Sequence, residues 1–194
     1  MKNYLLFTLL TFGLLIIGCG SKGGPDLSPE ASTKTVKNIP DWYLNTPVND
    51  GYQYAAAEAT SQSMQLAVDK ARVAAVSNLS QMIKSEWNGY TKRVQEETGM
   101  GADSKLLDQF STTQENVISN QLENVIVKEK EIQVENSGGT RIYRTFVLVE
   151  LDENAAQAKL LAQIKADQQL YDAIKASELI DEMEQKVEAY RQRK

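Results

Sequence analysis

From Met64 to Val94, apolar side chains recur every three or four residues, and this period is the strongest constraint on the fold. A run of this length at helical spacing predicts one long amphipathic α-helix. Thr60 or Ser61 is a natural N-cap for it, and Gly99 marks its end. Because the side chains early in the run are small, we expect the first part of the helix to pack closely on a sheet.

The segments next to this helix predict an alternation of strand and helix. Residues 52–59, rich in small side chains, predict a strand before it. A second helix follows, with Asp103 or Ser104 as its N-cap and apolar residues at helical spacing from Leu106 to Leu122.

After the second helix, the apolar period changes to that of a β-hairpin. Residues 125–134 are rich in β-branched and charged side chains, and residues 141–151 predict a central strand. Asn136-Ser137-Gly138-Gly139 between them is a strong turn signal, because glycine adopts positive φ without penalty. The apolar phase slips between Val127 and Ile132, which predicts a bulge or a bend.

The remaining residues, from Asp152 almost to the C-terminus, predict a single last helix with two apolar stripes. The stripes are offset between Ile174 and Ile180, like a stutter in a coiled coil. We expect the first half of this helix to pack on the sheet. The second half either covers the core or projects as a coiled-coil arm for self-association or for a partner.

The first residues predict a leader peptide. Lys2 gives it a positive start, the stretch from Tyr4 to Ile17 is almost wholly apolar, and Cys19, the single cysteine, follows. An apolar core of about 14 residues is too short for a membrane span, which needs roughly 20. Its end resembles the lipobox of bacterial lipoproteins, in which cleavage before the cysteine leaves it as the acylated first residue. We therefore expect residues 1–18 to be a signal peptide and Cys19 to carry acyl chains such as palmitate.

Acyl chains on Cys19 would anchor the protein in a membrane. Gly20 stands where an aspartate would retain a lipoprotein at the inner membrane, so we expect the outer membrane. The sequence leaves open whether the protein faces the periplasm or the cell surface. Residues 19–38 hold hardly an apolar side chain, which predicts a lipidated cysteine followed by a flexible tether. Trp42 and Tyr43 then either hold the start of the domain on its core or form an exposed contact for a ligand.

Composition narrows the chemistry that the chain can perform. There is no histidine, and the one thiol is expected to carry lipid. This removes the commonest general base, Cys/His nucleophile pairs and zinc sites built from His or Cys. No phosphate-binding, dinucleotide-binding or calcium-loop motif occurs, and 26 acidic against 21 basic residues argue against a nucleic-acid partner. We expect no catalytic residue, no metal and no cofactor, and a protein that is not an enzyme.

Two blocks of sequence resemble the Lpp-twenty family of bacterial surface lipoproteins. The first holds Ile39-Pro40-Asp41-Trp42-Tyr43, the segment 55–60 and the alanines Ala67, Ala71, Ala74 and Ala75, and the second holds residues 122–125 with 143–150. The resemblance covers residues 39–151 and implies a compact α+β domain at the outer membrane, with helices packed on a small antiparallel sheet. Residues 152–194 form a C-terminal helical extension beyond it. The family has no agreed catalytic residues, and similar domains occur in a flagellar assembly protein.

Two hypotheses of function follow. The leading one is a non-enzymatic outer-membrane lipoprotein whose domain binds envelope proteins, in assembly or scaffolding of a surface or flagellar-type structure. The alternative is an envelope ligand-binding module that captures a small apolar molecule or a glycan. Candidate contacts for a ligand or partner are Trp42, Tyr43, Trp87 and Tyr90, of which Trp42, Trp87 and Tyr90 would line the pocket of the ligand-binding module. A lipid-anchored hydrolase would need a Ser–Lys or paired-carboxylate site to form in three dimensions.

Overall fold

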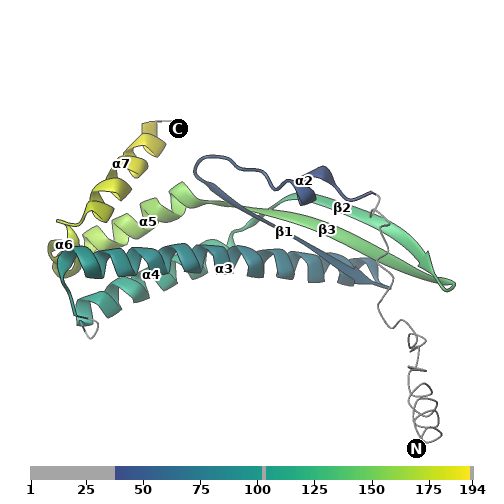
Figure 1. The fold of residues 1–194 in the computed structure, drawn as a ribbon, viewed down its shortest axis with the longest axis horizontal. Coiled ribbons are helices and arrows are strands. Elements are labelled where there is room, and N and C mark those ends of the chain that lie inside the picture. The colour runs from purple at the N-terminus through teal and green to yellow at the C-terminus, as the bar shows by residue number, and fades with distance from the viewer. Residues whose placement is uncertain (1–37, 102–103, 193–194) are drawn as a thin grey trace, which may run out of the picture. The chain divides into compact units, whose positions relative to one another are not determined.

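A computed structural model of the chain describes residues 38–101 and 104–192 (Figure 1). The predicted leader, Cys19 and nearly all of the predicted tether lie outside the described residues. The described residues form α2 (Asp41–Leu44), β1 (Tyr52–Ser61), α3 (Met64–Thr98), α4 (Lys105–Glu123), β2 (Ile126–Ser137), β3 (Thr140–Asp152), α5 (Glu153–Ala166), α6 (Gln168–Ile174) and α7 (Glu178–Gln192). The predicted α+β class with a small antiparallel sheet is confirmed.

The sheet has the strand order β1-β3-β2, so β3 is central and both other strands are edges. The predicted hairpin is confirmed, with Gly138 and Gly139 at its turn with φ of 57° and 81°. Positive φ at both central positions is the pattern of a type I′ turn, whose twist matches that of the strands. The predicted irregularity in the first hairpin strand is also confirmed, because the register shifts between Val127 and Glu129.

Helix α3 runs along one face of the sheet and continues beyond it to pack against α4, α6 and α7 (Figure 1). Gly99 ends it in the left-handed conformation, as predicted. Its N-cap is Ser63, whose hydroxyl accepts a hydrogen bond from Leu66 N. The prediction of Thr60 or Ser61 was wrong, because β1 continues to Ser61 through its pairing with β3. Helix α4 begins after Ser104, whose side chain makes no capping hydrogen bond.

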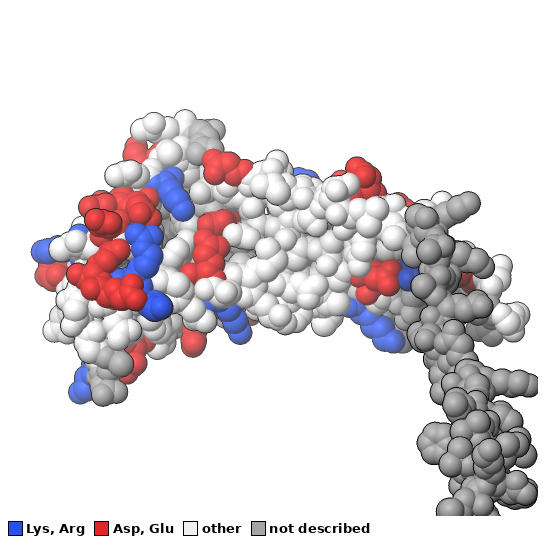
Figure 2. Space-filling model, in the orientation of Figure 1, with Lys and Arg blue, Asp and Glu red and all other residues white. Residues whose placement is uncertain are grey.

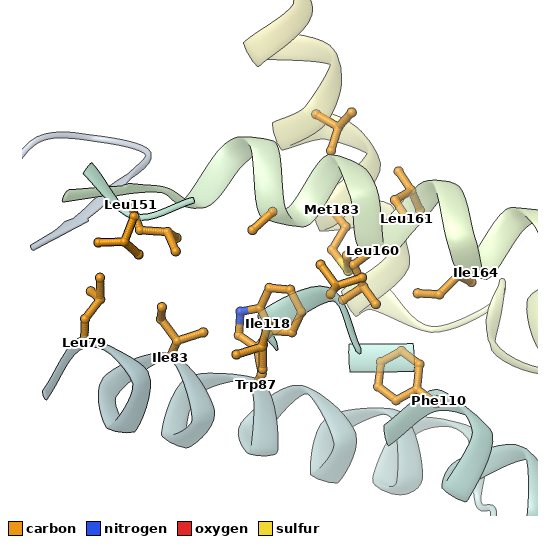
Figure 3. Close-up of a cluster of buried hydrophobic side chains, with 14 of the residues drawn as sticks. Leu79, Ile83, Trp87, Phe110, Ile118, Leu151, Leu160, Leu161, Ile164 and Met183 are labelled. Carbon is orange, nitrogen blue, oxygen red and sulfur yellow. The ribbon is translucent and has the colours of Figure 1, made fainter. Parts of the chain in front are cut away.

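Small side chains place α3 on the sheet. Ala71 and Ala75 are fully buried and share one apolar cluster with Ala57 of β1 and Val147 of β3. The same four-residue spacing continues with larger buried side chains, namely Leu79, Ile83 and Trp87. Figure 3 shows Leu79 pointing toward Leu151 of β3, and Trp87 lying beside Ile118 of α4 and Leu160 of α5. Alanines therefore allow close approach to the sheet, and larger residues fill the space between helices.

The two faces of β3 are covered by different segments. Val147 and Val149 belong to the cluster formed with α3. Phe146 and Leu148 point to the opposite face and are equally buried. On that face Tyr43 of α2 meets Phe146 edge-on, with ring centroids 5.0 Å apart.

The prediction of a single last helix was wrong, since residues after β3 form α5, α6 and α7. Asp167 separates the first two, because its backbone is extended and its carboxylate accepts a hydrogen bond from Leu170 N at 3.0 Å. The second break includes Ser177, close to the predicted offset between the stripes. Helix α5 packs mainly on α4 and α7 rather than on the sheet. The apolar residues of α7 are buried in the domain: Leu179, Ile180, Met183 and Val187. The second half of the extension therefore covers the core.

Candidate functional site

The four aromatic residues that the sequence offered as contacts lie in two separate places. Trp42 and Tyr43 are half-buried on α2, on the sheet face opposite α3. Trp87 and Tyr90 are neighbours on α3, with ring centroids 6.2 Å apart. The structure therefore does not bring Trp42 and Trp87 into one pocket.

The pair on α2 holds the start of the described domain against the sheet. Trp42 packs edge-on against Tyr43 at 6.4 Å, and Tyr43 in turn packs on the buried Phe146. Burial raises the pKa of the Tyr43 phenol, and the carboxylate of Glu58 raises it further. These contacts match the first of the two roles that the sequence allowed for the pair.

Trp87 belongs to the core of the domain. It is 1% exposed and lies in the same cluster as Phe110, Ile118 and Leu160 (Figure 3). Beside it, a groove of about 440 Å³ runs between α3 and α4. Its lining residues are Lys84, Trp87, Asn88, Ser111, Gln114, Glu115, Ile118, Ser119 and Leu122. Six of these nine residues are polar or charged, and the other three, Trp87, Ile118 and Leu122, are apolar.

Close to Trp87, a polar network joins β1, α3 and α5. The Nε2 of Gln53 donates hydrogen bonds to Glu86 Oε2 at 3.0 Å and to Glu153 Oε2 at 3.1 Å. The Tyr90 hydroxyl donates to Glu86 Oε1 at 2.7 Å. The Nε2 of Gln157 donates to Glu153 Oε1 at 2.6 Å and to the Tyr90 hydroxyl at 3.2 Å. All four carboxylate oxygens of this Glu86–Glu153 network thus accept a hydrogen bond from the protein.

The surroundings of Glu153 favour the protonated form of its carboxyl group. Burial raises the pKa of Glu153, and the neighbouring Glu86 raises it further, whereas Gln53 and Lys186 oppose the rise. Carboxyl groups that share one amide nitrogen repel each other when both are ionised. The pKa of the Tyr90 phenol is also raised, first by burial and then by Glu86, so it remains protonated as a donor.

A cavity of about 310 Å³ lies against Glu153. Its lining residues are Asp50, Gly51, Glu153, Asn154, Gln185, Lys186 and Ala189. Gly51 has a φ of 80°, and its carbonyl accepts hydrogen bonds from the backbone N–H groups of Glu153 and Asn154 at 3.0 and 3.3 Å. The charged groups of this lining are the carboxylates of Asp50 and Glu153 and the ammonium group of Lys186. Protein donors already occupy each carboxylate oxygen of Glu86 and Glu153. The evident role of the Glu86–Glu153 network is therefore to join β1, α3 and α5.

Sequence reasoning missed the Glu86–Glu153 network. Glu86 has the spacing of an ordinary charged residue on a helix, and Glu153 lies in a first helical turn, where an acidic residue suits the helix dipole. The two are separated by α4 and the hairpin, so no local pattern relates them. The sequence allows a paired-carboxylate site, but it does not identify which two carboxyl groups would form it.

Within residues 38–101 and 104–192, no helix combines the length and apolarity needed to cross a membrane. Among the same residues, no group of three or more acidic, histidine or cysteine side chains is arranged to hold a metal ion. Comparison of the chain with models of known families, with curated proteins and with solved structures gave no match. The resemblance to the Lpp-twenty family and the lipidation of Cys19 stay predictions.

Proposed function

We propose that this chain is a bacterial outer-membrane lipoprotein whose folded domain binds other envelope proteins, in assembly or scaffolding of a surface or flagellar-type structure. The observation that carries the proposal is the apolar leader that ends at Cys19, followed by a polar segment and a folded unit that begins at Asn38. Two or three acyl chains on Cys19 would anchor the protein stably, whereas a single chain binds a membrane only marginally. The resemblance to the Lpp-twenty family supports the same role.

The surface of the domain supports a binding role. Two large apolar side chains of α3, Leu66 at 47% and Val73 at 69% exposed, line one hollow on this helix. Exposed apolar side chains that lie together favour contact with another protein. The apolar face of α7 is buried in its own domain, so a partner would have to use other surfaces.

Acylation is tested by metabolic labelling with an alkyne analogue of palmitate in a Gram-negative host. We expect the native chain to be labelled and to fractionate with the outer membrane. Cys19→Ser should lose the label and the membrane fraction, and the matched control Ser21→Ala should keep both. Label that persists on the Cys19→Ser variant would contradict acylation at this position.

The partner is tested by crosslinking the acylated chain in living cells of its own bacterium, followed by purification and mass spectrometry. One envelope protein that recurs in stoichiometric amount would support the assembly role. The Cys19→Ser variant serves as the control, because a partner in the envelope should not be captured by a chain that is not anchored there. Absence of any envelope protein from crosslinks of the anchored chain would contradict the proposal.

The groove between α3 and α4 favours a second candidate function, an envelope module that captures a small apolar molecule or a glycan. Its volume of about 440 Å³ is within the range of small-molecule sites. In Trp42→Phe, Trp87 is the single tryptophan and reports on this groove. A change in its emission on titration with short oligosaccharides or fatty acids would support this function. Unchanged emission together with unchanged thermal unfolding would contradict it for the compounds tested.

A further inference from the structure

The two edge strands of the sheet, β1 and β2, differ in how well they are protected against pairing with a strand of another chain. Strand β2 has a register shift between Val127 and Glu129 and four consecutive charges at residues 128–131. Bulges and charged side chains are the common means by which proteins prevent edge-to-edge pairing. Strand β1 has no proline, no lysine and no register shift, and Glu58 is its single charge. Among the described elements, none pairs with its outer edge.

The part of α3 beside β1 is also uncharged. No charged residue occurs in the eleven-residue segment from Val73 to Ile83, about three turns of helix. Asn78 identifies the side of α3 that lies along β1, because its Nδ2 donates to the carbonyl of Ala56 at 3.3 Å. Residues one turn away on that side include Gln81 and Met82, both exposed. Figure 2 shows a broad surface without charged side chains over β1 and this part of α3.

We infer that this surface binds a second copy of the chain, with the two β1 strands paired antiparallel to form a six-stranded sheet. A two-fold contact requires a surface that is complementary to itself. When the pairing is centred on Ala56, Glu58 lies opposite Tyr54 of the second copy, so no like charges face each other. The small side chains of β1 and the uncharged flank of α3 allow the two helices to approach without repulsion. The Ala56 carbonyl already accepts a hydrogen bond from Asn78. The other backbone groups at the free edge gain hydrogen-bond partners in the paired sheet.

This inference does not rest on the proposed function, since the contact forms whether or not the chain binds another envelope protein. Anchoring both copies in one membrane would favour pairing by raising their effective concentration.

The register is tested by disulfide formation in the full chain, expressed in the envelope and oxidised in isolated membranes. Ala56→Cys places a thiol at the proposed two-fold axis, where paired residues have Cα atoms close enough for a disulfide. Glu131→Cys is the matched control, because Glu131 is exposed at the middle of the β2 edge and on the same sheet face. We expect Ala56→Cys to form a disulfide-linked dimer, and Glu131→Cys and the native chain to remain uncrosslinked. No dimer with Ala56→Cys, equal dimer with both variants, or a disulfide to a different protein would overturn the inference.

The affinity of the contact is tested by sedimentation of the detergent-solubilised full chain. Gln81→Glu adds a carboxylate to the proposed interface with little change of shape and leaves the hydrogen bond from Asn78 to Ala56 in place. Asn116→Asp makes the same amide-to-carboxylate change on an exposed position of α4. We expect the first variant to raise the Kd of dimerisation roughly tenfold, because like charges then face each other, and the second to leave it unchanged. Thermal unfolding shows whether both variants keep the fold. A native chain that sediments as a monomer, or equal Kd values for native and Gln81→Glu chains, would overturn the inference.

Discussion

Gln53 and Glu153 lie 100 residues apart in the sequence, and the Nε2 of Gln53 donates a hydrogen bond of 3.1 Å to Glu153 Oε2. The same nitrogen donates to Glu86, so one amide of β1 binds carboxyl groups from both α3 and α5. The contact lies where the sheet meets the helices that follow it. The protonation of Glu153 is therefore linked to the joining of these two parts of the domain.

Glu153→Gln should change how stability depends on pH. The pKa of Glu153 is raised above 4.5, so between 4.5 and the raised value the folded chain holds more protons than the unfolded chain. The free energy of unfolding contributed by this group therefore falls as pH rises through that window. We expect Glu153→Gln to be more stable than the native chain above the window, and the difference to shrink below pH 4.5. Urea unfolding over a pH series measures it.

The control for this series is Glu188→Gln, which removes one charge from an exposed position of α7. It should not show the same pH-dependent gain. A stability difference for Glu153→Gln that stays constant from acid to neutral pH would show that Glu153 does not titrate as proposed.

Trp87→Ala should be among the most destabilising single substitutions in the domain. The side chain is 1% exposed and packs between helices, so its loss leaves a large cavity. We expect the free energy of unfolding to fall by about 3–5 kcal/mol in urea titrations. Trp42→Ala is the comparison, because Trp42 is only half-buried and should cost clearly less. An equal fall in the free energy of unfolding for the two substitutions would contradict a core role for Trp87.

The hairpin turn should tolerate asparagine at Gly138 but not valine at Gly139. Both glycines have positive φ, and a Cβ added to either would meet no atom within 4 Å, so backbone conformation alone determines the cost. We expect Gly138→Asn to remain within about 0.5 kcal/mol of the native chain, since asparagine adopts this conformation readily. Gly139→Val should lower the free energy of unfolding by roughly 1–2 kcal/mol. Similar urea midpoints for both variants would be inconsistent with a type I′ turn.

We expect the ion pairs of Arg144 to contribute less to stability than the buried ring of Phe146. Its guanidinium contacts Glu58 at 2.9 Å and Glu135 at 2.7 Å, but the arginine side chain is 29% exposed and the glutamates are more so. We expect Arg144→Gln to cost about 1 kcal/mol or less, and the cost to diminish in molar salt. Phe146→Ala, two residues along the same strand face, should cost about 3–5 kcal/mol regardless of salt. A salt-independent loss for Arg144→Gln as large as that of Phe146→Ala would refute this ranking.

Elements with a strong local signal were predictable from the sequence. The apolar period from Met64 to Val94 predicted α3, and the left-handed cap at Gly99 ended it as expected. The paired glycines at Gly138 and Gly139 predicted the turn, and the phase slip of apolar residues predicted the register shift in β2. Each of these signals acts within a few residues, so no tertiary contact was needed to infer it.

Predictions failed where distant contacts determine the local structure. Strand β1 extends to Ser61 because β3 supplies its hydrogen-bond partners, and this moves the start of α3 to Ser63. The last segment keeps helical spacing across Asp167, so periodicity could not show that the chain turns there to place α7 against α5.

The sequence by itself determined the α+β class, the long helix α3 and the hairpin, because these depend on apolar spacing and on glycines at the turn. Only the tertiary structure decided which side chains meet. It brought Glu86 to Glu153, placed Trp42 on the sheet face opposite α3 and Trp87 in the core between helices, and left the β1 edge unpaired among the described elements. The physical reason is that contacts between distant segments depend on how their surfaces pack together, and no pattern within a few residues encodes that packing.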